Sequence, residues 1–190
     1  MYFSDLRKWV LIVAALYALF EGSVYYKAWK MEHQFVSDLR ESKVYEDTSI
    51  DSIYSDFLRI TNFHPGDQTV SIKLVKFPYQ LNWIEIVDPQ TDATLNDAIG
   101  YANGMNDDEK VDVYLDLNEW KKLNYIQKKS VLYHELLHDC FNTEHSRDRC
   151  NLMYSHISDC QIKGGTSRMR EESLDLQLNR IIHGNFNSNE

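Results

Sequence analysis

Short runs of apolar residues, some alternating with polar ones, predict four β-strands in this chain. The clearest run covers 111–117, and further strands are expected over 70–74, over 83–87 and over 98–105, where two glycines weaken the pattern. The clearest strand has apolar residues at Val111, Val113, Leu115 and Leu117 and other residues at Asp112, Tyr114 and Asp116. Since side chains alternate between the two faces of a strand, such strands should face a core on one side.

Apolar residues at helical spacing predict three helices, from about 50 to 60, from about 124 to 141 and from 168 to 182. The first should end at Asn62, Pro65 and Gly66. In the second, the residues expected to pack on the sheet are Tyr133, Leu136, Leu137 and Cys140. Together these elements indicate an α+β fold in which a small mixed sheet packs on the 124–141 helix.

The start of that helix carries its own signal. Asn124 can accept hydrogen bonds from the free amides of the first turn, and Gln127 follows three residues later, as in a capping box. The helix should therefore begin at about residue 124.

Candidate chemistry lies in the second half of the same helix, where His134, Glu135 and His138 follow the order H-E-x-x-H. Residues four apart lie one above the other on a helix, so both imidazoles can reach one metal ion. The Glu135 carboxylate can then reach a water on that metal, as the general base of a zinc hydrolase must. The alternative is a helix that carries solvated histidines.

Catalytic zinc sites usually have three protein ligands, and His145 is the best third candidate. Asn142 tolerates the left-handed conformation that ends helices, and such an end would let the chain turn back toward the metal. Cys150 and His156 are alternatives, the cysteine because thiolates also bind zinc and the histidine because it follows nearby.

The segment from His134 to Tyr154 resembles the metzincin class of zinc peptidases, and its matrixin branch most closely. The resemblance rests on H-E-x-x-H, on His145-Ser146 and on Leu152-Met153-Tyr154, and it covers about 111–160. It departs from the family pattern at Leu137 and Asn142, where glycines are usual, and by one extra residue between His138 and the turn.

This resemblance implies zinc on His134, His138 and His145, Glu135 as the general base, and Met153 in a turn beneath the metal. It also implies a C-terminal helix after that turn. The strand at 98–105 would border the cleft and pair with an extended peptide, although an ordinary edge strand with a bulge fits the sequence equally well.

Two further features of this region have more than one interpretation. Asp139 can orient a ligand histidine or can be an ordinary solvated carboxylate of the helix. Cys140, Cys150 and Cys160 all flank the site, and in an exported protein one pair of them can form a disulfide.

Composition bounds the remaining possibilities. The 190 residues, 43% of them hydrophobic, suffice for one domain with a core and a small appendage. A net charge of -9 disfavours nucleic acid and anionic membrane surfaces as partners. No internal repeat is present.

The appendage is residues 1–30, where an apolar run from Trp9 to Phe20 follows Arg7 and Lys8. It predicts a signal anchor or signal peptide, and the lack of a small-residue cleavage site favours an uncleaved anchor. A buried or amphipathic helix of the fold is the alternative. Residues 31–49 are polar and should form a helical or loose spacer, followed by a catalytic domain over 50–190 outside the cytoplasm.

The sequence therefore predicts a zinc-dependent metalloendopeptidase that acts on peptide or protein substrates. Two other hypotheses use the same residues differently. One is a zinc-stabilised module that binds peptides without cleaving them, and the other is a membrane-anchored interaction protein whose histidines are incidental.

Overall fold

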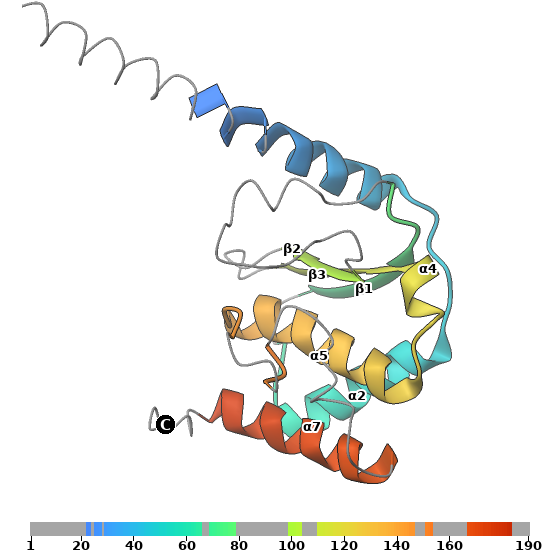
Figure 1. The fold of residues 1–190 in the computed structure, drawn as a ribbon, viewed down its shortest axis with the longest axis vertical. Coiled ribbons are helices and arrows are strands. Elements are labelled where there is room, and N and C mark those ends of the chain that lie inside the picture. The colour runs from blue at the N-terminus through green and yellow to red at the C-terminus, as the bar shows by residue number, and fades with distance from the viewer. Residues whose placement is uncertain are drawn as a thin grey trace, which may run out of the picture.

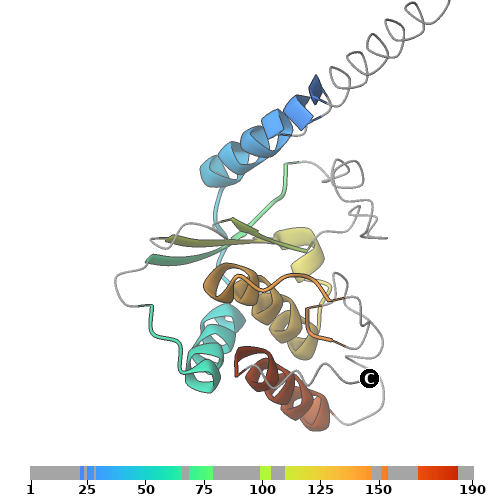
Figure 2. The same cartoon turned by 90° about the vertical axis from the view of Figure 1, so that its left-hand side faces the viewer.

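A sheet lies between two layers of helix in the computed structural model (Figures 1 and 2). The structure describes residues 22–23, 25–27, 29–65, 69–78, 99–103, 110–146, 151–153 and 167–183. The strand expected over 83–87 lies outside these residues. Along the described residues helices come first, three strands follow and helices come last, so the α+β class expected from the sequence is confirmed.

The described sheet has three strands in the order β1-β3-β2, which are β1 (Thr69–Val75), β3 (Lys110–Asp116) and β2 (Gly100–Asn103). β1 runs parallel to β3, whereas β2 runs antiparallel to it, so the sheet is mixed, as expected. β2 keeps only four residues of the strand predicted over 98–105 and lies at the edge of the described sheet.

β3 differs from its sequence pattern because both of its faces are covered. Asp112, Tyr114 and Asp116 were expected to face away from the core, yet their exposed fractions are only 1%, 0% and 6%. Lys110 forms an ion pair with Asp112 at 2.5 Å, which compensates for part of the burial of that carboxylate. Leu117 does not extend the strand but begins the short helix α4 (Leu117–Trp120), whose first amides Asp116 caps.

The second face of the sheet is covered by a helix over residues 29–41 (Figure 1). Its Phe35 and Leu39 are fully buried, and the Phe35 ring meets the rings of Phe77 and Tyr101 edge-on, with centroids 5.5 Å apart in each pair. Farther along, Tyr45 donates a backbone hydrogen bond to the carbonyl of Leu74 in β1. The expected spacer is therefore helical up to residue 41 and packs on the sheet.

Three helices lie on the other side of the sheet: α2 (Thr48–Thr61), α5 (Tyr125–Phe141) and α7 (Ser167–Ile182), which packs on α2 and α5 farther from the strands (Figures 1 and 2). All three were predicted to within a few residues. α2 begins at Asp47, which accepts from the Ser49 amide, and ends at Asn62 with a left-handed φ of 52°. α5 begins with the predicted capping box, in which Asn124 and Gln127 exchange bonds of 3.0 and 2.9 Å.

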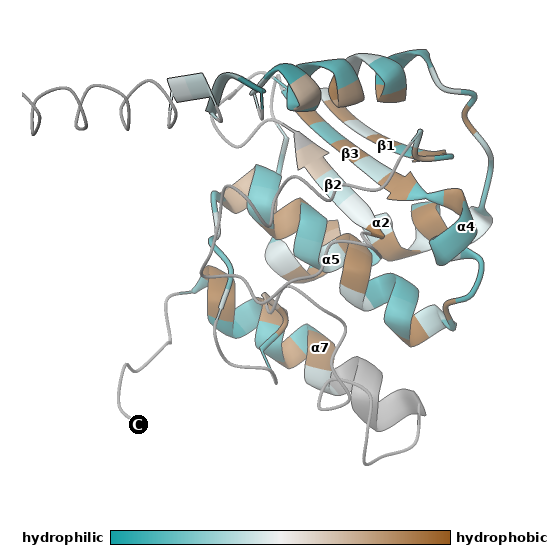
Figure 3. Cartoon of the chain, turned by 45° about the horizontal axis from the view of Figure 1, so that its top comes forward, coloured by the Kyte–Doolittle hydropathy of each residue, from teal (hydrophilic) through white to brown (hydrophobic). Residues whose placement is uncertain are grey.

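Apolar side chains from the sheet and these helices form one core, and the brown positions in Figure 3 follow β3 and recur on α5 and α7. The core includes Trp120, Leu132 and Leu136, all fully buried. It also includes Leu152 and Met153, so the segment expected to turn beneath the metal is anchored in the same core.

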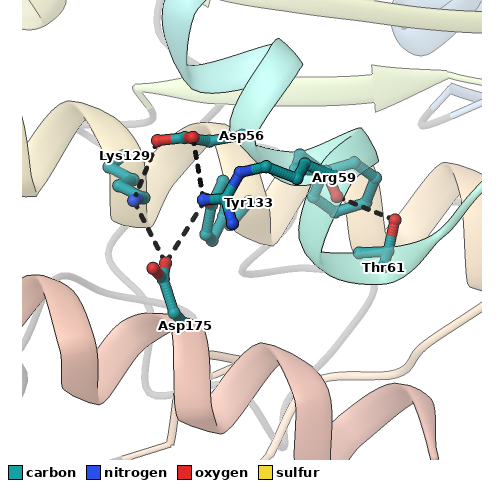
Figure 4. A network of polar contacts seen from close by, with 7 residues as sticks. Asp56, Arg59, Thr61, Lys129, Tyr133 and Asp175 are labelled. Carbon is teal, nitrogen blue, oxygen red and sulfur yellow. Dashed lines mark hydrogen bonds and ion pairs between the residues drawn. The ribbon is translucent and has the colours of Figure 1, made fainter.

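A buried lysine joins the three helices (Figure 4). Lys129 of α5 is 1% exposed, and its ammonium lies 3.3 Å from Asp56 of α2 and 3.1 Å from Asp175 of α7. The Tyr133 hydroxyl also donates to Asp175 at 3.4 Å, and its ring contacts Phe57 of α2. Tyr133 therefore contacts the neighbouring helices, although the sequence pattern had suggested the sheet.

Among the helices in the described ranges, none has the length and hydropathy needed to cross a membrane. The apolar run from Trp9 to Phe20 lies outside these ranges.

Candidate metal centre

Three imidazole rings converge where α5 ends. His134 and His138 lie on successive turns of the helix, and His145 comes from the segment after it. Their Nε2 atoms form a nearly equilateral triangle, with 3.0 Å between His134 and His138, 3.1 Å between His138 and His145, and 3.2 Å between His134 and His145. The structure therefore brings together the three histidines that the sequence motif singled out.

The triangle fits a zinc ion. A tetrahedral site with Zn–N bonds of about 2.0–2.1 Å separates its nitrogen ligands by about 3.3 Å, close to the spacing between the three Nε2 atoms. All three ligands offer nitrogen, a donor that zinc prefers. Within the described ranges no fourth ligand atom joins these three, so a tetrahedral ion held by them would have one further position for water or substrate, as catalytic zinc sites do.

Outer hydrogen bonds orient two of the rings. Nδ1 of His134 donates to the backbone carbonyl of Leu152 at 2.9 Å, and Nδ1 of His138 donates to the carbonyl of Thr143 at 2.6 Å. Because a carbonyl can only accept, each Nδ1 carries the proton of the neutral ring, and each Nε2 presents its lone pair to the centre. Lone pairs that face each other at 3.0 Å repel, and a cation between them removes that repulsion.

The charge state of the rings agrees with this arrangement. Burial, assisted by the neighbouring His138, lowers the pKa of His134 to about 3. Burial and the neighbouring His145 lower the pKa of His138 to about 4. Both imidazoles are therefore neutral near pH 7, the form that binds metal.

Asn142 makes the turn that delivers the third histidine. Its φ and ψ of 49° and 39° are left-handed, as predicted, and its amide donates to the Leu137 carbonyl. The Thr143 amide donates to the same carbonyl at 3.2 Å, while the Thr143 carbonyl accepts from His138. One turn thus ends the helix, orients His138 and redirects the chain toward His145.

Residues 151–153 connect two of the histidines. The Leu152 carbonyl accepts from His134, and the Met153 carbonyl accepts from the amide of Ser146, the residue after His145, at 2.8 Å. Met153 itself is 2% exposed. The segment that the family resemblance identifies as a methionine turn therefore contacts both ends of the histidine cluster.

Gln177 holds that segment from α7. Its side-chain oxygen accepts from the Leu152 amide at 2.7 Å, so a continuous path of hydrogen bonds leads from α7 through Leu152 to His134. Sequence reasoning missed Gln177 because one polar residue on an amphipathic helix carries no signal of its partner.

Glu135 points to the sheet side of α5 and is only 9% exposed. It lies directly against Gly100 of β2, because a β-carbon at position 100 would be 2.4 Å from Oε1 and 2.6 Å from Cγ of Glu135. Burial raises the pKa of Glu135 to about 8, a hydrogen bond from the Ala102 backbone opposes that rise, and the charge of Asp139 adds to it. The carboxyl group is thus held between α5 and β2.

Asp139 does not orient His134 or His138, because the Nδ1 atoms of both rings donate to backbone carbonyls. It is half-buried, and its charge adds to the rise that burial causes in the pKa of Glu135 and of Cys140. Cys140 carries a free thiol. Cys150, Cys160 and His156 lie outside the described residues, so the proposed disulfide and the two alternative ligands are not placed.

Comparison with known proteins adds no identification: no protein-family model matches the chain, and neither a curated protein nor a solved structure matches it.

Proposed function

We propose that this protein is a zinc-dependent metallopeptidase that hydrolyses peptide bonds. The observation that carries the proposal is the convergence of the Nε2 atoms of His134, His138 and His145 within 3.2 Å of one another, where the rings of His134 and His138 turn their lone pairs toward the centre. Glu135 follows the first of these ligands directly in the chain. A cluster of solvated histidines would have no reason to orient two rings through hydrogen bonds to backbone carbonyls.

The metzincin class is part of this proposal. Its support is the left-handed turn at Asn142, the contact of residues 151–153 with both ends of the histidine cluster, and α7 after that segment. The mixed sheet packed on α5 is compatible with such a domain.

His134, His138 and His145 would hold the zinc ion. When bound, zinc supplies a Lewis acid that activates water and polarises a carbonyl group. The remaining proton transfers belong to Glu135, whose carboxylate accepts a proton from the attacking water and gives it to the departing amine. Burial raises the pKa of this carboxyl to about 8. A bound cation would lower that pKa toward the pH range in which a general base works best.

The substrate in this proposal is an extended peptide beside β2. That strand pairs with β3 along one side and is at the edge of the described sheet. A peptide that adds to this edge would run past Gly100, which contacts Glu135. An edge strand without such a role remains the alternative, and binding of a substrate-like peptide inhibitor with altered exchange of the β2 amides would favour peptide addition.

The direct test combines metal content with turnover in the full chain purified in detergent. We expect one zinc per chain, lost in His138→Ala and His145→Ala. Glu135→Gln should keep the zinc and lose hydrolysis of a peptide library, and undiminished proteolysis in that variant would refute the mechanism. Zinc without cleavage by the parent would favour a peptide-binding module, and no zinc at all would favour an interaction protein.

We also propose that residues 1–30 anchor the chain in a membrane, with the metal centre outside the cytoplasm. The support is the apolar run from Trp9 to Phe20 without a cleavage site. Full-length protein should stay with the membrane fraction after a carbonate wash, and its release would contradict the anchor.

A further inference from the structure

The N-terminal helix has two parts with different surroundings. Residues 22–23, 25–27 and 29–41 are all helical. The part near its C-terminal end packs on the sheet through the fully buried Phe35 and Leu39, and Glu32 accepts a hydrogen bond from the Tyr101 hydroxyl at 3.2 Å. The other part extends beyond the sheet (Figures 1 and 2). One helix therefore belongs to the domain at one end and leaves it at the other.

The projecting part exposes large aromatic rings. Tyr25 and Tyr26 are each 61% exposed and Trp29 is 53% exposed, the highest values among the large apolar side chains of the described residues. The Tyr26 and Trp29 rings stack with centroids 6.0 Å apart, and Trp29 also contacts the His33 ring at 4.1 Å. We call Tyr25, Tyr26 and Trp29 the aromatic patch. A patch of this kind on a surface usually marks a contact with another molecule or with a membrane.

Its residue types indicate the headgroup layer of a bilayer. Tyrosine and tryptophan have an apolar ring and a polar group, and they are enriched where hydrocarbon meets water. Four residues separate Phe20, the end of the apolar run, from Tyr25. Even a fully extended chain would place Tyr25 within about 18 Å of that end, at or near the headgroup region.

The charge of the chain indicates whether the lipid headgroups at this surface are anionic or zwitterionic. Lys27 and Lys30 are exposed beside the patch, but the net charge of -9 opposes attraction to anionic lipid. Contact by ring insertion does not need anionic lipid, so a zwitterionic surface such as phosphatidylcholine fits better.

We propose that Tyr25, Tyr26 and Trp29 lie in the headgroup layer of the membrane, as an aromatic belt next to the anchor. This inference rests on the proposed anchor in residues 1–30. Because Phe35 and Leu39 of the same helix are buried in the domain, the belt also determines how far the sheet and the histidine cluster stand from the bilayer. A loose spacer would leave that distance variable.

Tryptophan quenching tests the proposal on the full chain in phosphatidylcholine vesicles. The emission lost on Trp29→Phe is the signal of Trp29, an exposed residue whose replacement leaves the buried contacts intact. This signal should fall several-fold with a lipid that carries a nitroxide on its headgroup. It should change little with a nitroxide deep in the acyl chain or with iodide in the water.

A second tryptophan position and a vesicle-retention assay distinguish failure of the aromatic belt from failure of the anchor. Tyr25→Trp in the Trp29→Phe background should show the same quenching. Retention of the protein by vesicles after a carbonate wash, together with full iodide quenching of Trp29, would overturn the belt and leave the anchor intact. Shielding from both iodide and the nitroxide lipids would mean contact with protein, such as a second copy, and would also overturn it. Failure of the vesicles to retain the protein would refute both anchor and belt.

Discussion

Replacing Gly100 by alanine is the most direct test of the contact between β2 and Glu135 of α5. The new β-carbon would be 2.4 Å from Oε1, 2.6 Å from Cγ and 2.7 Å from Cδ of Glu135. All three distances are well below van der Waals contact, so either the Glu135 side chain or the strand must move. Because Glu135 is only 9% exposed, its side chain has little free space in which to do so.

The sign of the stability change separates this clash from the usual effect of alanine. In an unstrained position Gly→Ala stabilises a protein by about 0.4–1 kcal/mol, because it restricts the unfolded chain. Overpacking of a filled core costs about 1–3 kcal/mol. We therefore expect Gly100→Ala to lower the free energy of unfolding by about 1–3 kcal/mol, which is about 2–12 °C in Tm for a chain of this size.

A double-mutant cycle assigns the loss to Glu135. In Glu135→Ala the three clashing atoms are absent, so adding Gly100→Ala should be neutral or stabilising by up to about 1 kcal/mol. Urea unfolding of the four proteins, followed by circular dichroism with a chelator present, measures the cycle without a contribution from metal. An equal loss in both backgrounds would refute the contact. In the parent background, turnover should also fall about 100-fold with zinc retained, since displacement of a catalytic group by about 1 Å has that effect.

Three other predictions follow from the hydrogen bonds and ion pairs. Gln177→Leu should weaken zinc binding about 10- to 100-fold in a competition titration, because it removes the acceptor of the Leu152 amide. Gln177→Glu still accepts from Leu152 and should weaken zinc binding less. Equal zinc affinities of the two variants would contradict a role of this hydrogen bond in orienting His134. Lys129→Ala should cost about 2–3 kcal/mol in urea unfolding and Lys129→Met clearly less, because both remove the ammonium but only alanine also leaves a cavity. The value is below that of fully buried pairs since Asp56 and Asp175 are 30% and 27% exposed and Asp56 keeps its ion pair with Arg59 at 3.0 Å. Equal losses in the two variants would contradict this reasoning. Burial tends to raise the pKa of Asp47, but hydrogen bonds from Lys128 and others outweigh it and hold the pKa well below its ordinary value. The resulting stability is present above about pH 4 and is lost as the pH falls further. The difference in the free energy of unfolding between the parent and Asp47→Asn, measured in urea, should therefore shrink below about pH 4. A difference that does not change with pH would contradict the lowered pKa of Asp47.

Interactions within a few residues were readable from the sequence. The capping box of Asn124 and Gln127, the left-handed end at Asn142 and the four-residue spacing of His134 and His138 each depend on local backbone geometry alone. For the same reason the three helices of the lower layer and two strands of the sheet were found within a few residues of their observed ends. The H-E-x-x-H motif is itself such a local pattern, so it could be recognised in the sequence.

Contacts between distant segments depended on the tertiary structure. The alternation over 111–117 indicated one buried face of β3, but the helix over 29–41 also buries the second face. The residue pattern of the strand itself could not predict that a distant helix packs there. The approach of Gly100 to Glu135, the bond from Gln177 to Leu152 and the burial of Lys129 between two carboxylates each join residues at least 25 positions apart. The periodicity of apolar residues indicates which side of a helix or strand is apolar, but it does not identify the segment that packs on that side. The sequence by itself therefore determined which side chains could bind a metal, and only the folded chain decided what orients those side chains.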